Sequence, residues 1–252
     1  MNRHSSPRLS ALVEIGILFL PAIPAYLWMW PNLKGVQNDI VQAIVYLYVL
    51  AGTLYIGRRR WNWDQLGLNR KGIWLTAACG LVILAARLMI ILSIDWAVHP
   101  ASLTWFQVSI GLIYYFGLVG LVEELLFRGL IYRLLVDWKG VRWAIWGSSI
   151  GFGLWHIFGQ GPLAGGATLL IGLLFALIRW RGGGIVGLIV LHGLWDLETV
   201  WLVSDSNTAI LSPGAIAFRY PVLVWLGFVL LLLVPAYLGW LHPRLERYWR
   251  KR

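Results

Sequence analysis

Eight apolar stretches, separated by short polar segments, follow one another along the chain. A helix needs about 20 mostly apolar residues to cross a bilayer. The pattern predicts eight transmembrane helices at about residues 11–30, 38–56, 73–94, 104–126, 143–158, 163–180, 184–203 and 220–241. Because these helices leave too few residues for a soluble domain, residues 1–252 are predicted to form a single all-α polytopic membrane domain.

The composition excludes a soluble globular protein. Hydrophobic residues make up 59% of the chain and charged residues 13%, against roughly 25% charged residues in an average globular domain. A surface exposed to water would therefore lack charged side chains. The single cysteine, Cys79, also excludes an intramolecular disulfide and a cysteine-based metal cluster.

The net charge of +10 comes from 21 basic and 11 acidic residues. If the N-terminus is cytoplasmic and the chain crosses eight times, 18 of the 21 basic residues fall in cytoplasmic segments. These are Arg3, Arg8, Arg58, Arg59, Arg60, Arg70, Lys71, Arg128, Arg133, Lys139, Arg142, Arg179, Arg181, Arg244, Arg247, Arg250, Lys251 and Arg252. This bias follows the positive-inside rule. It predicts that both termini are cytoplasmic, and that the basic residues report topology in a lipid bilayer rather than binding to nucleic acid. The compact chain without a transit peptide favours a bacterial plasma membrane.

Three of the apolar stretches contain ionisable residues that are costly to place in a bilayer and are functional candidates for that reason. They are Glu123 and Glu124 with Arg128 at the end of the fourth stretch, His156 after Phe152 in the fifth, and His192 with Asp196 in the seventh. Residues four apart share one face of a helix, so three helices can direct these side chains toward one interior point.

This set of side chains suits the hydrolysis of an amide bond. A carboxylate and an imidazole beside one water can remove its proton, and a second imidazole can donate to the oxyanion that develops on the attacked carbonyl. Two histidines and a carboxylate can instead hold a catalytic zinc ion with a position open for water. The residue types leave both routes open.

Each motif alone also has a simpler structural explanation. The Glu-Glu pair with Arg128 is typical of an ion pair at a cytoplasmic helix end. A histidine four residues after a phenylalanine can be a hydrogen-bonded packing residue, and Asp196 can simply hold the imidazole of His192. The three motifs in order, on separate predicted helices, favour a common site.

The order Glu123-Glu124-x-x-x-Arg128, Phe152-x-x-x-His156 and His192-x-x-x-Asp196 resembles the three-motif signature of the CPBP family. This family comprises CAAX-processing endopeptidases and bacteriocin-processing or self-immunity membrane proteins. The flanking segments Phe127-Arg128-Gly129-Leu130 and Gly182-Gly183-Gly184-Ile185-Val186 agree with it. The resemblance covers roughly residues 110–200, which we expect to form the catalytic core.

The resemblance implies a role for each motif residue. Glu123 and His156 would activate the water, and His192 and Asp196 would stabilise the oxyanion. Glu124 and Arg128 would support the site by fixing the helix end and the orientation of Glu123.

Asp196 departs from the family pattern, in which this position is often Asn. An Asn amide can donate to an oxyanion, whereas an ionised Asp can only accept. Asp196 must therefore be protonated, bind a metal, or orient His192. A metal-free site is favoured; if a divalent metal such as zinc is used, its ligands would come from Glu123, His156, His192 and Asp196.

The sequence thus predicts an intramembrane endopeptidase that hydrolyses a peptide bond, near the cytoplasmic side, in a prenylated, lipidated or membrane-inserted protein or peptide. Two alternatives stay open, a non-catalytic peptide-binding or bacteriocin self-immunity protein and a small proton-coupled transporter. Arg87, within the third predicted helix, could meet a substrate carboxylate or pair with Glu14 or Glu198.

Overall fold

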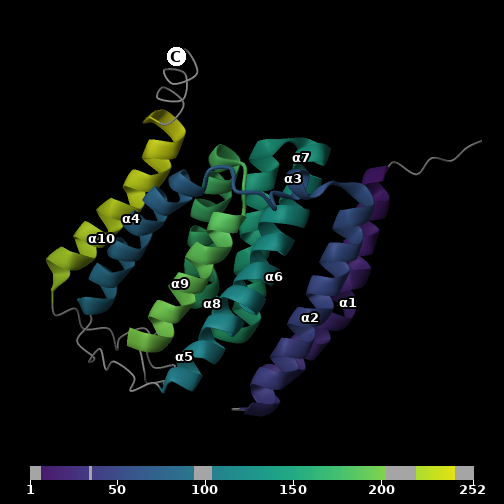
Figure 1. The fold of residues 1–252 in the computed structure, drawn as a ribbon, viewed down its shortest axis with the longest axis horizontal. Coiled ribbons are helices and arrows are strands. Elements are labelled where there is room, and N and C mark those ends of the chain that lie inside the picture. The colour runs from purple at the N-terminus through teal and green to yellow at the C-terminus, as the bar shows by residue number, and fades with distance from the viewer. Residues whose placement is uncertain (1–6, 34–35, 94–103, 203–219, 242–252) are drawn as a thin grey trace, which may run out of the picture.

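A computed structural model describes residues 7–33, 36–93, 104–202 and 220–241, and the regular elements in these ranges are all helices (Figure 1). The elements are α1 (Pro7–Asn32), α2 (Val36–Arg60), α3 (Trp63–Leu66), α4 (Ile73–Leu92), α5 (Trp105–Leu112), the π-helical η1 (Ile113–Gly120), α6 (Leu121–Glu124), the π-helical η2 (Leu125–Ile131), α7 (Tyr132–Lys139), α8 (Val141–Gly182), α9 (Val186–Leu202), α10 (Pro221–Ala236) and the π-helical η4 (Tyr237–Leu241).

The prediction of an all-α polytopic membrane protein is confirmed. Five helical segments within the described ranges are long and apolar enough to cross a membrane, at Ile40–Arg60, Ile73–Leu92, Val108–Lys139, Gln160–Gly182 and Val222–Gly239. Each of the remaining predicted spans also coincides with a helix or half of one, namely α1, the first half of α8, and α9. The count of eight crossings stays a prediction.

The boundary between the fifth and sixth predicted helices is a kink inside α8. Gly161 has a φ of 84°, outside the helical region, and Pro162 follows it. A residue with a side chain rarely adopts this φ, and proline removes a backbone donor that a continuous helix would use. The two residues therefore divide α8 into two arms at the predicted position.

The fourth predicted helix extends beyond its predicted end near residue 126. The helical segments from α5 through α7 follow one another without interruption from Trp105 to Lys139. The ionisable residues Glu123, Glu124 and Arg128 are buried within this run and do not mark its end. Placing Arg128 in a cytoplasmic segment is therefore wrong, because its charge is neutralised inside the protein rather than by water.

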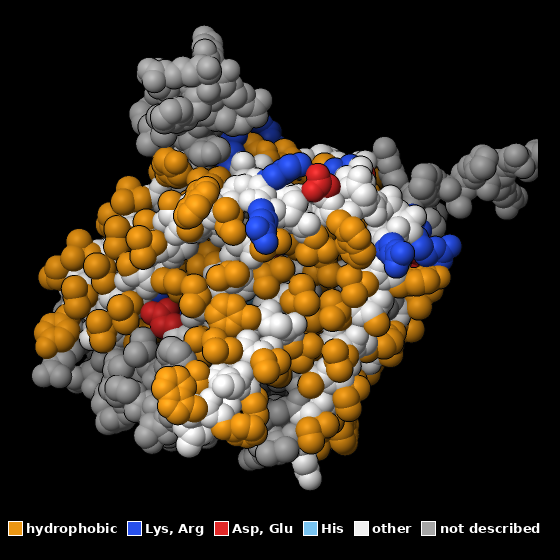
Figure 2. All heavy atoms as spheres, in the orientation of Figure 1, with side chains coloured by type: hydrophobic (Ala, Val, Ile, Leu, Met, Phe, Trp, Pro, Cys, Tyr) orange, Lys and Arg blue, Asp and Glu red, His pale blue; other side chains and the backbone are white. Residues whose placement is uncertain are grey.

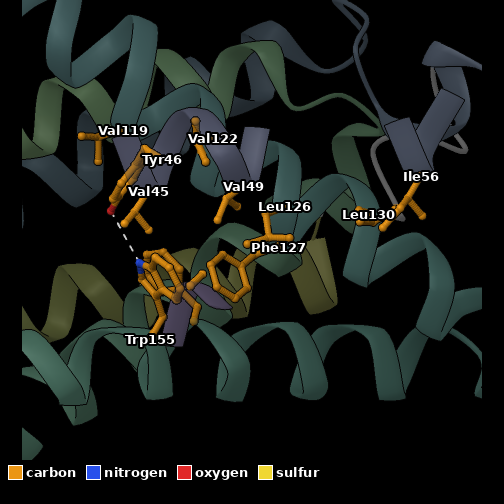
Figure 3. Close-up of a cluster of buried hydrophobic side chains, with 12 residues drawn as sticks. Val45, Tyr46, Val49, Ile56, Val119, Val122, Leu126, Phe127, Leu130 and Trp155 are labelled. Carbon is orange, nitrogen blue, oxygen red and sulfur yellow. Dashed lines mark hydrogen bonds between the residues drawn. The ribbon is translucent and has the colours of Figure 1, made fainter. Parts of the chain in front are cut away.

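The two largest buried clusters join most of the helices of the bundle. The first joins α2 to η1, α6, η2 and the first arm of α8 through residues that include Tyr46, Phe127 and Trp155 (Figure 3). The second joins α4, the second arm of α8, α9 and α10, and includes Phe175 and Leu191. Helices α1 and α2 pack together on one flank and α4 and α10 on the other, so the central helices α6, α8 and α9 lie between the two pairs.

One end of the bundle collects the basic residues, and we call it the basic end. It contains the end of α2, α3, the beginning of α4, the end of α7, the beginning of α8 and the α8–α9 turn. Contacts across it include Trp61 Nε1 to Asp137 Oδ2 at 2.9 Å and Arg179 Nη2 to the Gln65 carbonyl at 3.2 Å. In Figure 2, Lys and Arg side chains gather near this end, while hydrophobic side chains cover the flank below it. This distribution is what the positive-inside rule expects of a spanning protein.

Candidate active site

The structure brings the polar residues of the three motifs together at one point. Glu123 comes from α6, His156 from the first arm of α8, and His192 and Asp196 from α9. Glu123 Oε2 lies 3.8 Å from His156 Nε2 and 3.6 Å from His192 Nε2. His192 Nε2 also lies 3.6 Å from Asp196 Oδ2. The convergence that helical spacing predicted is therefore present.

These side chains face a cavity of about 410 Å³. Its walls come from α2, α4, η1, α6, both arms of α8, and α9, and they combine aromatic with polar side chains. Besides the motif residues, the lining includes Gln42, Tyr46, Arg87, Gln160, Thr168 and Trp195.

One carboxylate oxygen of Glu123 accepts a hydrogen bond that fixes the side chain, and the other is left for a further hydrogen bond. The hydroxyl of Tyr46, on α2, donates a hydrogen bond to Glu123 Oε1. Trp155 Nε1 in turn donates to the Tyr46 hydroxyl at 3.5 Å. Glu123 Oε2 is buried and accepts no hydrogen bond from the described residues. Because a buried carboxylate oxygen needs a donor, a water molecule is the natural partner for Oε2.

His156 presents a basic nitrogen to this oxygen. Its Nδ1 lies 2.9 Å from the backbone carbonyl of Phe152, one turn earlier in α8. A carbonyl only accepts hydrogen bonds, so we assign the proton to Nδ1. In the neutral ring the lone pair is then on Nε2, which faces Glu123.

His192 is oriented by Glu124. The Nδ1–H of His192 donates to Glu124 Oε1 at 2.8 Å, which directs Nε2 toward Glu123 and Asp196. Glu124 Oε1 also pairs with Arg128 Nη1 at 3.0 Å, and both of these side chains are fully buried. Glu124 therefore belongs to the site through His192 as well as through Arg128.

Arg128 is enclosed by aromatic rings. Its guanidinium carbon lies 4.1 Å from the centroid of the Phe152 ring and 5.4 Å from that of Phe175, an arrangement in which the ring quadrupole stabilises the cation. Phe152 also contacts His156, with ring centroids 4.5 Å apart. Gly172 makes room for these side chains, because a Cβ there would lie 3.1 Å from Phe152 and 3.2 Å from Arg128 Nη2.

Tyr46 is the site residue that the sequence analysis missed. It belongs to none of the three motifs, and a tyrosine in an apolar stretch is a common packing residue. The one indication in the sequence was that a tyrosine hydroxyl, once buried, needs a hydrogen-bond partner. The partner is identified once α2 packs against α6.

Two further carboxylates of the membrane helices, Glu198 and Glu14, are paired with arginines. Arg87 Nη1 lies 3.4 Å from Glu198 Oε2 and donates to the Trp195 carbonyl. Its guanidinium also lies over the Trp195 ring. Glu14 pairs with Arg60 at 2.7 Å. Of the partners expected for Arg87, the structure therefore selects Glu198.

Among the residues that the structure describes, no group of three or more His, Cys, Asp or Glu side chains is placed to hold one metal ion. The zinc alternative stays a prediction.

The comparison with protein families bears on residues 104–197. This stretch matches the family model described as Type II CAAX prenyl endopeptidase Rce1-like. No curated protein matches the chain, and no solved structure does. The matched stretch contains all three motifs, and the match confirms that this polytopic membrane protein resembles the CAAX-processing endopeptidases of the CPBP family.

Proposed function

We propose that the protein is an intramembrane endopeptidase that hydrolyses a peptide bond of a membrane-associated protein or peptide, with Glu123 and His156 activating the water. The observation that carries the proposal is the position of Glu123 Oε2. It is buried, has no hydrogen-bond donor among the described residues, and faces the Nε2 atoms of two histidines at 3.6 and 3.8 Å beside a cavity.

The first chemical step is the attack of water. A water between Glu123 Oε2 and His156 Nε2 gives one proton to Glu123 while its oxygen bonds to the scissile carbonyl carbon. Such a general base contributes about 10² to 10⁴ to the rate. The Tyr46 hydrogen bond occupies the other oxygen of Glu123, so Oε2 is the oxygen that receives the proton.

The second requirement is stabilisation of the oxyanion. When both nitrogens of His192 are protonated, Nδ1–H donates to Glu124 and Nε2–H can donate to the developing oxyanion. Asp196, at 3.6 Å from this Nε2, orients the ring or donates as the carboxylic acid. The tetrahedral intermediate then collapses, the C–N bond breaks, and the proton held by Glu123 passes to the leaving nitrogen.

The similarity to CAAX prenyl endopeptidases supports a lipidated or membrane-inserted substrate. The cavity is consistent with such a substrate, because it is surrounded by helices that are apolar enough to span a bilayer and combines aromatic walls with polar groups. We propose that no metal takes part in the step.

The test is hydrolysis of a fluorogenic prenylated or apolar peptide by the purified protein in detergent. Glu123→Gln and His156→Ala should each lower turnover by about 10² to 10⁴ while the protein still accumulates. Glu14→Gln is the matched control, because Glu14 is also a carboxylate on a membrane helix, but it pairs with Arg60 and does not line the cavity. Full turnover by Glu123→Gln would refute the assignment. Wild-type protein that binds the peptide without cleaving it would favour the non-catalytic alternative.

A further inference from the structure

Arg87, on α4, is the permanent cation of the cavity. Among the described residues that line the cavity, it is the only lysine or arginine. A charged side chain within a membrane helix is costly and is therefore a functional candidate. Arg87 lies outside residues 104–197, so the similarity to CAAX prenyl endopeptidases assigns it no role.

The guanidinium of Arg87 is held against α9, beside the reacting groups. Its carbon lies 3.8 Å from the centroid of the Trp195 ring, and Nη1 donates to the Trp195 carbonyl. Asp196, the next residue along α9, has its Oδ2 atom 3.6 Å from His192 Nε2. The cation is therefore one residue away from a group that belongs to the three motifs, and it lines the same cavity.

The ion pair between Arg87 and Glu198 is loose. Arg87 Nη1 lies 3.4 Å from Glu198 Oε2, whereas charge-assisted hydrogen bonds between nitrogen and oxygen are about 2.7–2.9 Å long. The other membrane pair, Arg60 with Glu14, has this shorter length at 2.7 Å. Glu198 is also not among the described residues that line the cavity. It can therefore hold Arg87 in place while a second carboxylate approaches the guanidinium from the cavity.

We infer that Arg87 binds a carboxylate of the substrate and makes the protein selective for peptides with an anionic group close to the scissile bond. The inference rests on the proposed function for the reaction and on separate geometry for the binding. A carboxylate that leaves water for a cavity between membrane helices needs a cation as partner, and the planar fork of a guanidinium matches its two oxygens. This carboxylate is either the C-terminus of the substrate or an acidic side chain.

Three fluorogenic prenylated peptides test the inference on the wild-type protein in detergent. They share one sequence that ends in glutamine, as the free acid, as the C-terminal amide, and as the amide with glutamate in place of that glutamine. Because hydrogen bonds to charged groups are strong, kcat/KM should be about 10-fold to 150-fold higher for a recognised carboxylate than for the uncharged amide. Preference for the free acid identifies the C-terminus as the ligand, and preference for the glutamate peptide identifies a side chain. Equal kcat/KM for the three peptides would overturn the inference.

Arg87→Gln separates recognition from a structural role. The readout is the ratio of kcat/KM between the preferred peptide and the uncharged amide, which this variant should bring close to one. A purely structural role would lower kcat/KM for all peptides in proportion and keep the wild-type ratio, which would contradict the inference. Arg59→Gln is the matched control and should keep the ratio, because Arg59 is exposed at the basic end and does not line the cavity.

The double variant Arg87→Gln/Glu198→Gln covers the case in which Arg87→Gln does not fold. It removes both charges of the pair, so that Glu198 is not left as an unpaired charge in the membrane. The ratio should again fall close to one, and a wild-type ratio in the double variant would count against a role of Arg87 in recognition.

A binding measurement separates this inference from the proposed function. If wild-type protein cleaves none of the three peptides, their affinities are compared by fluorescence anisotropy. Tighter binding of a charged peptide than of the uncharged amide, lost in Arg87→Gln, would mean that the proposed function fails and the role of Arg87 stands. Equal affinities of the three peptides would refute both.

Discussion

Tyr46→Phe tests whether the position of Glu123 depends on a helix outside the three motifs. The substitution removes one hydroxyl, which donates to Glu123 Oε1 and accepts from Trp155 Nε1. The ring remains, and with it the edge-to-face contact with Trp155, whose centroid lies 6.2 Å away. The packing of α2 against α6 and α8 should therefore persist while Glu123 loses its fixed orientation.

The expected loss follows from the type of hydrogen bond removed. A hydrogen bond to a charged group contributes about 1.5–3 kcal/mol. Each 1.36 kcal/mol in the barrier is a factor of ten in rate, so turnover should fall by about 10-fold to 150-fold. This loss is smaller than that expected for Glu123→Gln, because the base itself is retained.

The assay is the pH profile of kcat and KM with the fluorogenic peptide. We expect kcat to fall with little change in KM and the profile to change, because the altered group acts on the base rather than on substrate binding. Tyr48→Phe is the matched control, since Tyr48 lies two residues further along α2 and is exposed on the surface of the bundle. The Tyr48→Phe variant should retain wild-type kcat.

The reasoning would be refuted by a Tyr46→Phe enzyme with wild-type kcat and an unchanged pH profile. A change in KM alone would indicate that Tyr46 contacts the substrate and does not position Glu123. Equal thermal stability of the two Phe variants excludes unfolding as the cause of a lower kcat.

Glu124→Gln should lower both activity and the amount of folded protein, measured by turnover and size-exclusion yield, because it leaves the buried Arg128 without its counter-charge at a cost of about 3–5 kcal/mol. Wild-type yield would show that Arg128 does not depend on this pair. Asp196→Asn should retain most of its turnover from pH 5 to 9 and resist a strong chelator, whereas an inactive variant together with a chelator-sensitive parent would indicate a metallopeptidase. Gly172→Ala should lower the melting temperature and turnover because its Cβ meets Phe152 and Arg128. Gly166→Ala is its control, with no atom within 4 Å of the added Cβ, and equal effects of both alanines would exclude this steric explanation.

The predicted secondary structure was accurate where its physical cause is local in the sequence. Apolar stretches specify membrane helices because an unpaired backbone group is costly in lipid, and Gly161 with Pro162 specifies the kink locally. The end of the fourth helix was wrong because a local pattern treats Glu124 and Arg128 as exposed. Their mutual pairing inside the fold was not visible in that pattern.

The sequence by itself determined which residue types meet, because helical spacing fixes which side chains share a face and the three motifs lie on three predicted helices. Only the tertiary structure decided how they are oriented. Glu124 bonds to His192 across 68 residues, and Tyr46 bonds to Glu123 across 77. Such contacts depend on how the helices pack against one another. Helices of equal hydropathy can pack in different arrangements, so hydropathy alone does not fix these contacts.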